Sequence, residues 1–101
     1  MFDLKGKKAV VTGGGSGIGR AIAITLAQAG AEIFILDLNL DGANGVVDEI
    51  TTNGGTASCF ACDVSDPKSV QRAFEESLQE GVLDILVNNA GIAHIGNVGN
   101  T

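Results

Sequence analysis

Apolar and polar residues alternate along the chain in two distinct patterns. Short, nearly unbroken apolar runs lie at 8–12, 32–37, 56–64 and 83–87. Apolar runs of this length, bounded by polar or glycine residues, are typical of strands that are buried on both faces. Between the runs, apolar residues recur every three or four positions, which is the spacing of an amphipathic helix. The pattern therefore predicts four strands and three helices in alternation.

The predicted helices have recognisable faces and ends. The first covers 17–29, and Gly30 suits the left-handed position that ends it. Asp66 is placed to cap the third helix, with Pro67 at its first position and its end at Gly81. The expected apolar faces are Ile18, Ile22 and Leu26 in the first helix, Leu40, Ala43, Val47 and Ile50 in the second, and Val70, Phe74 and Leu78 in the third.

Strands that are apolar on both faces and joined by helices predict a parallel sheet with right-handed crossovers. We expect an α/β fold whose doubly wound sheet has the strand order 3-2-1-4. The chain reverses direction between the first and fourth strands, and ligands usually bind in the crevice at such a point. The segments 12–19 and 88–91 converge there. Two helices would then cover one face of the sheet and only the third the other, which leaves the fourth strand as an open edge.

Composition and charge narrow the class of protein. The chain has 101 residues, 45% of them hydrophobic, which fits one small folded domain. Its net charge of −6 disfavours nucleic acid and anionic membranes as partners. The sequence shows neither an apolar stretch of membrane-spanning length nor a signal peptide, so we expect a cytoplasmic location.

The two cysteines, Cys59 and Cys62, are spaced like a redox or metal pair. In a strand, however, residues three apart point to opposite faces and lie about 10 Å apart, beyond the reach of a disulfide. We therefore interpret both as reduced structural residues. We expect no bound metal.

A glycine-rich run, T-G-G-G-S-G-I-G at 12–19, lies between the first strand and the first helix. Gly13, Gly17 and Gly19 allow a tight turn and a close approach of the backbone to a pyrophosphate at the start of the helix. Asp37 ends the second strand, where a carboxylate can accept hydrogen bonds from an adenosine ribose. A carboxylate there repels a 2′-phosphate, and neither Ser16 nor Leu38 supplies a cation. The site is therefore expected to prefer NAD over NADP.

The chain resembles the short-chain dehydrogenase/reductase family. The resemblance is carried by the glycine run at 12–19, by Asp37, by Asp63-Val64 and by N-N-A-G at 88–91. It implies a Rossmann-like fold and a hydride-transferring oxidoreductase with an alcohol or carbonyl substrate, active as a homodimer or homotetramer. The residues that it assigns to the cofactor are Gly13, Ser16, Gly17, Ile18, Gly19, Asp37, Asp63, Val64, Asn89, Ala90 and Gly91.

The chain departs from the family in lacking its catalytic residues. Such enzymes use a Ser, a Tyr and a Lys four residues after the Tyr, and this sequence has no tyrosine. We interpret His94 as an exposed loop residue rather than as a proton-transfer group. Residues 1–101 are therefore expected to be the N-terminal, adenosine-binding half of an NAD-binding domain, inactive alone. The alternative is a non-catalytic nucleotide-binding or interaction module, complete at Thr101, that pairs through its exposed fourth strand.

Overall fold

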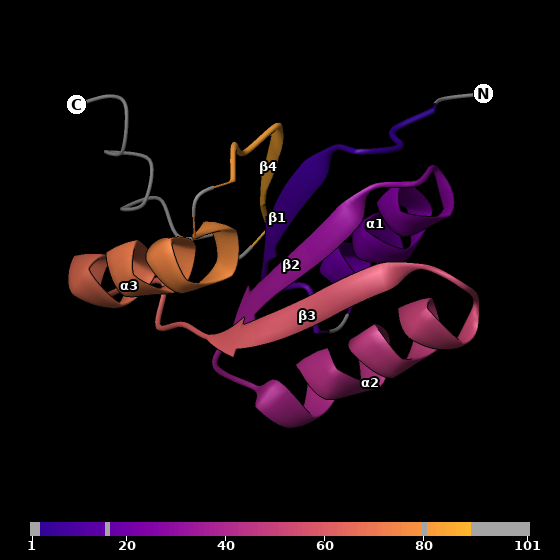
Figure 1. Cartoon of the computed structure of the whole chain (residues 1–101). Helices are drawn as coiled ribbons and strands as arrows, with labels where there is room; N and C mark the ends of the chain where they lie inside the picture. The colour runs from indigo at the N-terminus through magenta and orange to yellow at the C-terminus, as the bar shows by residue number, and fades with distance from the viewer. Residues whose placement is uncertain (1–2, 16, 80, 90–101) are drawn as a thin grey trace.

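The computed structural model describes residues 3–15, 17–79 and 81–89, which form the predicted alternation of strands and helices (Figure 1). The strands are β1 (Lys8–Thr12), β2 (Glu32–Asp37), β3 (Thr56–Ala61) and β4 (Ile85–Asn88). The helices are α1 (Gly17–Gln28), α2 (Leu40–Thr52) and α3 (Pro67–Leu78). Within the described ranges, no helix combines the length and the apolar character needed to cross a membrane.

The four strands pair in the order β3-β2-β1-β4, and every pairing is parallel. This order confirms the doubly wound arrangement predicted from the apolar runs. The register places Thr12 of β1 opposite Leu36 of β2 and Asn88 of β4. The carboxyl ends of these strands are therefore nearly level, and the loops that follow them start side by side.

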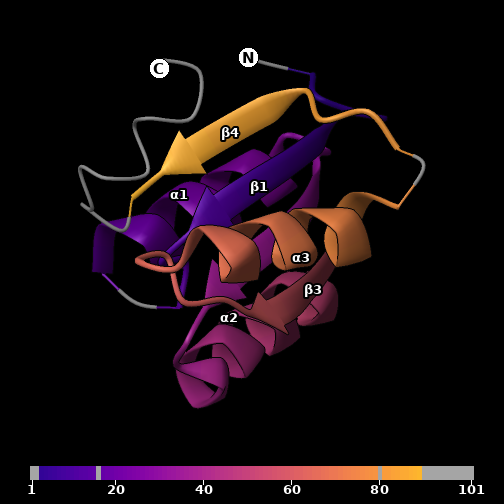
Figure 2. The same cartoon turned by 90° about the vertical axis from the view of Figure 1, so that its left-hand side faces the viewer.

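The helices cover the two faces of the sheet unequally, as predicted (Figures 1 and 2). On one face, Ala23 of α1 and Ile50 of α2 pack with Ile35 in a single buried cluster. On the other face, Ala73 of α3 packs with Phe34 in a second cluster. Figure 2 shows α3 alone in front of the sheet, with α1 and α2 behind it.

The third strand is shorter than predicted. It ends at Ala61 rather than at residue 64. The Cys62 N–H still donates to the Asp37 carbonyl of β2 at 3.3 Å, and the next N–H, that of Asp63, donates to Ser69 Oγ on α3 at 2.8 Å. A side chain of the following helix thus holds the backbone just past the end of the strand.

The fourth strand begins at Ile85 rather than at residue 83. Asp84 precedes it and is bonded twice to Lys8: its carboxylate accepts from the Lys8 N–H at 2.9 Å, and its own N–H donates to the Lys8 carbonyl at 3.0 Å. Among the described strands, β4 pairs with β1 alone, and Leu86 is 48% exposed. The expected open edge is confirmed for this part of the chain.

The expected apolar face of α1 is only partly correct. Ile18 is 72% exposed, and the buried residues of the helix are Gly19 and Ala23. Small residues lie at this interface because they let the helix axis approach the sheet closely. In α2 the buried residues include Val46, whereas Leu40, assigned to the apolar face, is exposed.

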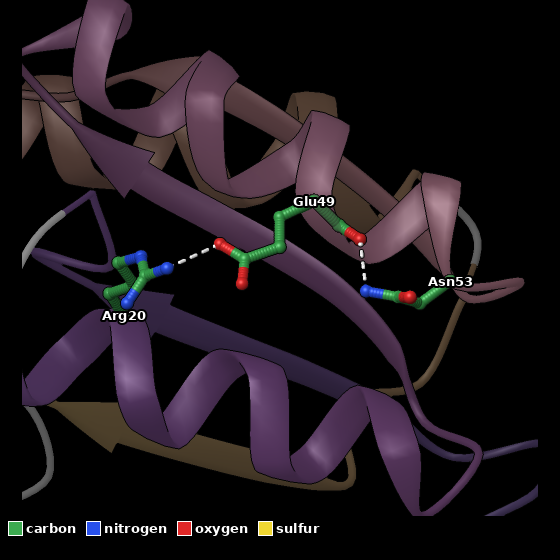
Figure 3. Close-up of polar contacts among 3 residues, drawn as sticks. All are labelled: Arg20, Glu49 and Asn53. Atoms are coloured by element: carbon green, nitrogen blue, oxygen red, sulfur yellow. Dashed lines mark hydrogen bonds and ion pairs between the residues drawn. The ribbon is translucent and has the colours of Figure 1, made fainter.

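A polar contact joins the two helices that share a face of the sheet (Figure 3). Arg20 of α1 forms an ion pair with Glu49 of α2. The side-chain amide of Asn53, just past α2, donates to the Glu49 carbonyl at 2.9 Å. The pair lies at the surface, where such contacts contribute little to stability, but it ties the first turns of α1 to α2.

Candidate cofactor site

Three segments meet at the carboxyl end of the sheet. They are the glycine loop that follows β1, Asp37 at the end of β2, and the turn at Asn88 and Asn89 that ends β4. Hydrogen bonds link the loop to each of the other two segments. The segments expected at the crevice between the first and fourth strands therefore lie together, and hydrogen bonds hold them there.

The loop after β1 turns sharply through glycine. Gly13 and Gly17 have φ values of 66° and 61°, in the left-handed region that favours glycine. Gly19 is buried, and a Cβ on it would overlap the Gly13 carbonyl oxygen and lie 2.5 Å from Asn89 Nδ2. A Cβ on Gly17 would meet no atom of the described residues within 4 Å, so that side of the loop is open in this part of the chain. An open backbone turn at the start of a helix suits a phosphate group.

Thr12, the last residue of β1, joins the glycine loop to the turn after β4. Thr12 is only 2% exposed. Thr12 Oγ1 accepts a hydrogen bond from the Asn89 N–H at 3.0 Å and donates one to Asn88 Oδ1 at 3.1 Å. The side-chain amide of Asn89 donates in turn to the Gly13 carbonyl at 3.2 Å. These bonds hold the two segments together without any ligand.

The half-buried carboxylate of Asp37 bridges the glycine loop and the start of α2. Its Oδ2 accepts from the Gly15 N–H at 3.1 Å, and its Oδ1 accepts from the Asn39 N–H at 2.9 Å. An ionised carboxylate has about four acceptor positions, so two remain for other donors. The carboxylate is thus fixed in orientation and still able to accept hydrogen bonds from a pair of hydroxyl groups.

Asp63 and Val64 follow β3 at the same end of the sheet, on the far side of β2 from the glycine loop. Asp63 Oδ1 accepts from the Ser65 N–H at 3.0 Å and from Ser65 Oγ at 2.6 Å. These two bonds stabilise the charged form and hold the pKa of the Asp63 carboxyl below its ordinary value. Val64 is half-buried and packs against the cluster beneath α3.

The cysteines lie on opposite faces of the sheet, as predicted. Cys59 packs against the cluster beneath α1 and α2, whereas Cys62 belongs to the cluster beneath α3, and both thiols are free. Burial raises the pKa of both thiols, and the nearby Asp48 carboxylate raises that of Cys59 further. These surroundings are the reverse of those that activate a redox thiol.

The model of the short chain dehydrogenase family matches residues 7–101. The chain belongs to this family. It is 47% identical over 89 residues to the 7alpha-hydroxysteroid dehydrogenase of Escherichia coli strain K12, a match that covers 87% of this chain and 35% of that relative. The family expected from the motifs is thereby confirmed.

Solved structures of the family share the fold described above. One is a 7 alpha-hydroxysteroid dehydrogenase complexed with NADH and 7-oxo glycochenodeoxycholic acid; it is 46% identical with a TM-score of 0.85, over 90% of this chain and 36% of that one. Another, from Beutenbergia cavernae with NADP bound at low occupancy, is also 46% identical, with a TM-score of 0.81 over the same shares of the two chains. The chain thus spans little more than a third of the length of these relatives.

The structure brings together most of the predicted site residues that it describes. Gly13, Gly19 and Asn89 are in mutual contact, and Asp37 is bonded to the same loop. Ile18, placed among the cofactor contacts, is exposed and therefore accessible. Four residues considered for the site lie outside the described residues: Ser16, Ala90, Gly91 and His94.

Three residues that organise this site lie within the two motifs but were not among the residues assigned to the cofactor: Thr12, Gly15 and Asn88. Thr12 carried a signal, because it is the one hydroxyl side chain in an otherwise apolar run at 9–12. Gly15 was masked by its position within a run of glycines, and Asn88 by its neighbour Asn89. Their roles depend on contacts between strands, which sequence spacing does not reveal.

Proposed function

We propose that residues 1–101 are the N-terminal, adenosine-binding half of an NAD-binding domain in an oxidoreductase. The reaction would be hydride transfer between a nicotinamide cofactor and an alcohol or carbonyl substrate. The observation that carries the proposal is the Asp37 carboxylate, hydrogen-bonded to Gly15 of the glycine loop at 3.1 Å. This pairing puts an acceptor for ribose hydroxyls next to a loop suited to a pyrophosphate.

The residues fit the cofactor chemically. The nicotinamide would supply the hydride donor or acceptor. The open turn at Gly13 and Gly17 would bind the pyrophosphate through backbone N–H groups, with Ser16, Ile18 and Gly19 beside it. The remaining proposed contacts are Asp37 with the adenosine ribose, Asp63 and Val64 with the adenine, and Asn89, Ala90 and Gly91 with the second ribose.

The preference for NAD over NADP follows from the charge of Asp37. A 2′-phosphate would lie beside this carboxylate, and two like charges about 4 Å apart repel by about 1 to 4 kcal/mol in surroundings that range from water to a protein surface. We therefore expect NAD to bind more tightly by a factor between about fivefold and about 700-fold.

Catalysis would need groups beyond this chain. The sequence has no tyrosine, so residues 1–101 hold no Tyr-Lys pair of the family type for proton transfer. We propose that the longer protein supplies these residues, acts on a small alcohol or carbonyl compound in the cytoplasm, and is a homodimer or homotetramer.

The test is the intact mass of the natively produced protein, with calorimetric titrations of NAD and NADP on the same sample. A mass well above 10.2 kDa with NAD preferred supports the proposal. A protein that binds neither dinucleotide would refute it. Asp37→Ala should abolish most of the preference for NAD, and an unchanged preference would remove Asp37 from the site.

A second candidate is a non-catalytic module that pairs with another chain through β4. The exposed Leu86 on this edge strand favours it, because an open apolar edge is a template for strand addition. A native mass of 10.2 kDa and no hydride transfer would support this function over the first.

A further inference from the structure

Gly15 is a glycine for a reason different from that of its neighbours in the loop. Gly13 and Gly17 have left-handed backbones, but the φ of Gly15 lies outside that region. Its φ is therefore one that residues with a side chain adopt. The need for glycine at this position is therefore one of space.

The space around Gly15 is filled by the Asp37 carboxylate and the start of α2. A Cβ on Gly15 would lie 2.8 Å from Asp37 Oδ2 and 3.0 Å from the backbone nitrogen of Ala43. Separations under 3.0 Å are essentially never seen for real Cβ atoms, so one group would have to move. The carboxylate turns about its side-chain bonds more easily than helical backbone shifts. A side chain at position 15 would therefore displace the carboxylate and break its bond with the Gly15 N–H.

The carboxylate is held from two sides. Gly15 N–H binds one oxygen, and Asn39 N–H binds the other. Asn39 also caps α2, because its side-chain oxygen accepts from the Gly42 N–H at 3.1 Å. Turning the carboxylate away from Gly15 would thus disturb an arrangement that includes the first turn of α2.

We infer that Gly15 is a positioning residue for cofactor specificity: by having no side chain, it lets its own N–H fix the Asp37 carboxylate in the orientation that selects an unphosphorylated ribose. The inference rests on the proposed function. It assigns the selection of NAD over NADP to two residues: Asp37, which supplies the carboxylate, and Gly15, which orients it.

The test compares Gly15→Ala with the wild type in the full natural protein. Calorimetry gives the dissociation constants of NAD, NADP, AMP, and AMP that carries an added 2′-phosphate. In Gly15→Ala, the preference for NAD over NADP, and for AMP over its phosphorylated form, should fall about tenfold, as expected for loss of one hydrogen bond to a charged group. Gly45→Ala is the matched control, because Gly45 is exposed on α2 and a Cβ there would meet no atom within 4 Å among the residues that the structure describes. It should leave both preferences unchanged.

Asp37→Ala separates this inference from the proposed function. If Asp37→Ala abolishes the preference and Gly15→Ala does not change it, the role of Gly15 is wrong and the proposed function stands. If neither variant changes it, the inference fails and Asp37 is removed from the site, whereas loss of binding of both dinucleotides by the wild type is what would refute the proposed function. In the Asp37→Ala background, Gly15→Ala should cause no further change in the preference, and a further fall would also overturn the inference.

A second measurement does not depend on how well Gly15→Ala folds. Hydrogen exchange of the Gly15 amide, measured without ligand, should be about tenfold faster in Asp37→Ala than in the wild type, because the amide loses its acceptor. Equal exchange rates would show that the carboxylate does not hold this N–H.

Discussion

Thr12→Val would remove one hydroxyl group from the junction between β1 and β4. Valine keeps the shape of threonine and suits a buried strand. The substitution therefore isolates the hydrogen bonds of Thr12 Oγ1, which accepts from the Asn89 N–H at 3.0 Å and donates to Asn88 Oδ1 at 3.1 Å.

The expected loss comes mainly from the Asn89 N–H. This donor is partly buried and would be left without its acceptor, which costs about 1 to 3 kcal/mol. The exposed Asn88 side chain can turn to water and adds little. We expect Thr12→Val to lower the free energy of unfolding by about 2 kcal/mol. Thr12→Ser keeps the hydroxyl and loses one methyl group, so it should lower the free energy of unfolding by about 1 kcal/mol.

Urea unfolding of the purified protein measures both variants against the wild type. The midpoint should shift while the slope stays constant, because the area exposed on unfolding hardly changes. The reasoning is refuted if Thr12→Val is as stable as Thr12→Ser or more so, since the hydroxyl would then contribute less than one methyl group.

Three further substitutions test other parts of the structure. Gly19→Ala should weaken NAD binding by about tenfold or more in calorimetry, because its methyl would overlap the Gly13 carbonyl; unchanged affinity would contradict the geometry of the loop. Ser65→Ala should raise the pKa of Asp63 toward its ordinary value of 3.8, as followed by NMR titration. The wild type should be the more stable of the two at pH 7, with the difference vanishing as the pH falls through the lowered pKa; a difference that persists in acid would implicate another interaction. Glu49→Gln should lower the free energy of unfolding by only about 0.2 to 1 kcal/mol, and less in high salt, because its ion pair is at the surface; a larger, salt-independent loss would contradict this.

The order of the strands could be predicted because parallel strands buried on both faces leave a strong local signal. β1 and β2 have the predicted bounds, Lys8–Thr12 and Glu32–Asp37, since each is flanked by strands and covered on both sides. The alternation with helices then left few topologies to consider.

The carboxyl end of β3 and the start of β4 differ from the prediction, and side-chain contacts lie at both. Asp84 meets Lys8 across 76 positions of sequence, and its carboxylate accepts the Lys8 N–H in place of a backbone carbonyl. Ser69 on α3 accepts from the Asp63 N–H just past the end of β3. Periodicity within a window of residues contains no information on such contacts.

In the candidate site, too, the sequence predicted which segments meet but not the hydrogen bonds between them. Glycine spacing and the acid at the end of β2 indicated which segments would meet, because parallel strands end at one edge of the sheet. The bonds from Gly15 to Asp37 and from Asn89 to Thr12 decide how the segments meet. Each depends on the register between two strands, which only the folded chain defines.

These bonds also bear on how a ligand would be bound. The Asp37 carboxylate and the Asn89 amide are already fixed by protein groups, so a dinucleotide would find them in place and their ordering would not oppose binding. The two acceptor positions that remain on Asp37 would then add to the effect of its charge, because their directions are set by Gly15 and Asn39. A carboxylate free to rotate would still repel a 2′-phosphate, but it would lose part of its hydrogen bonding to the unphosphorylated ribose. On the proposed function, selection at this site would therefore depend on the orientation of the carboxylate as well as on its presence.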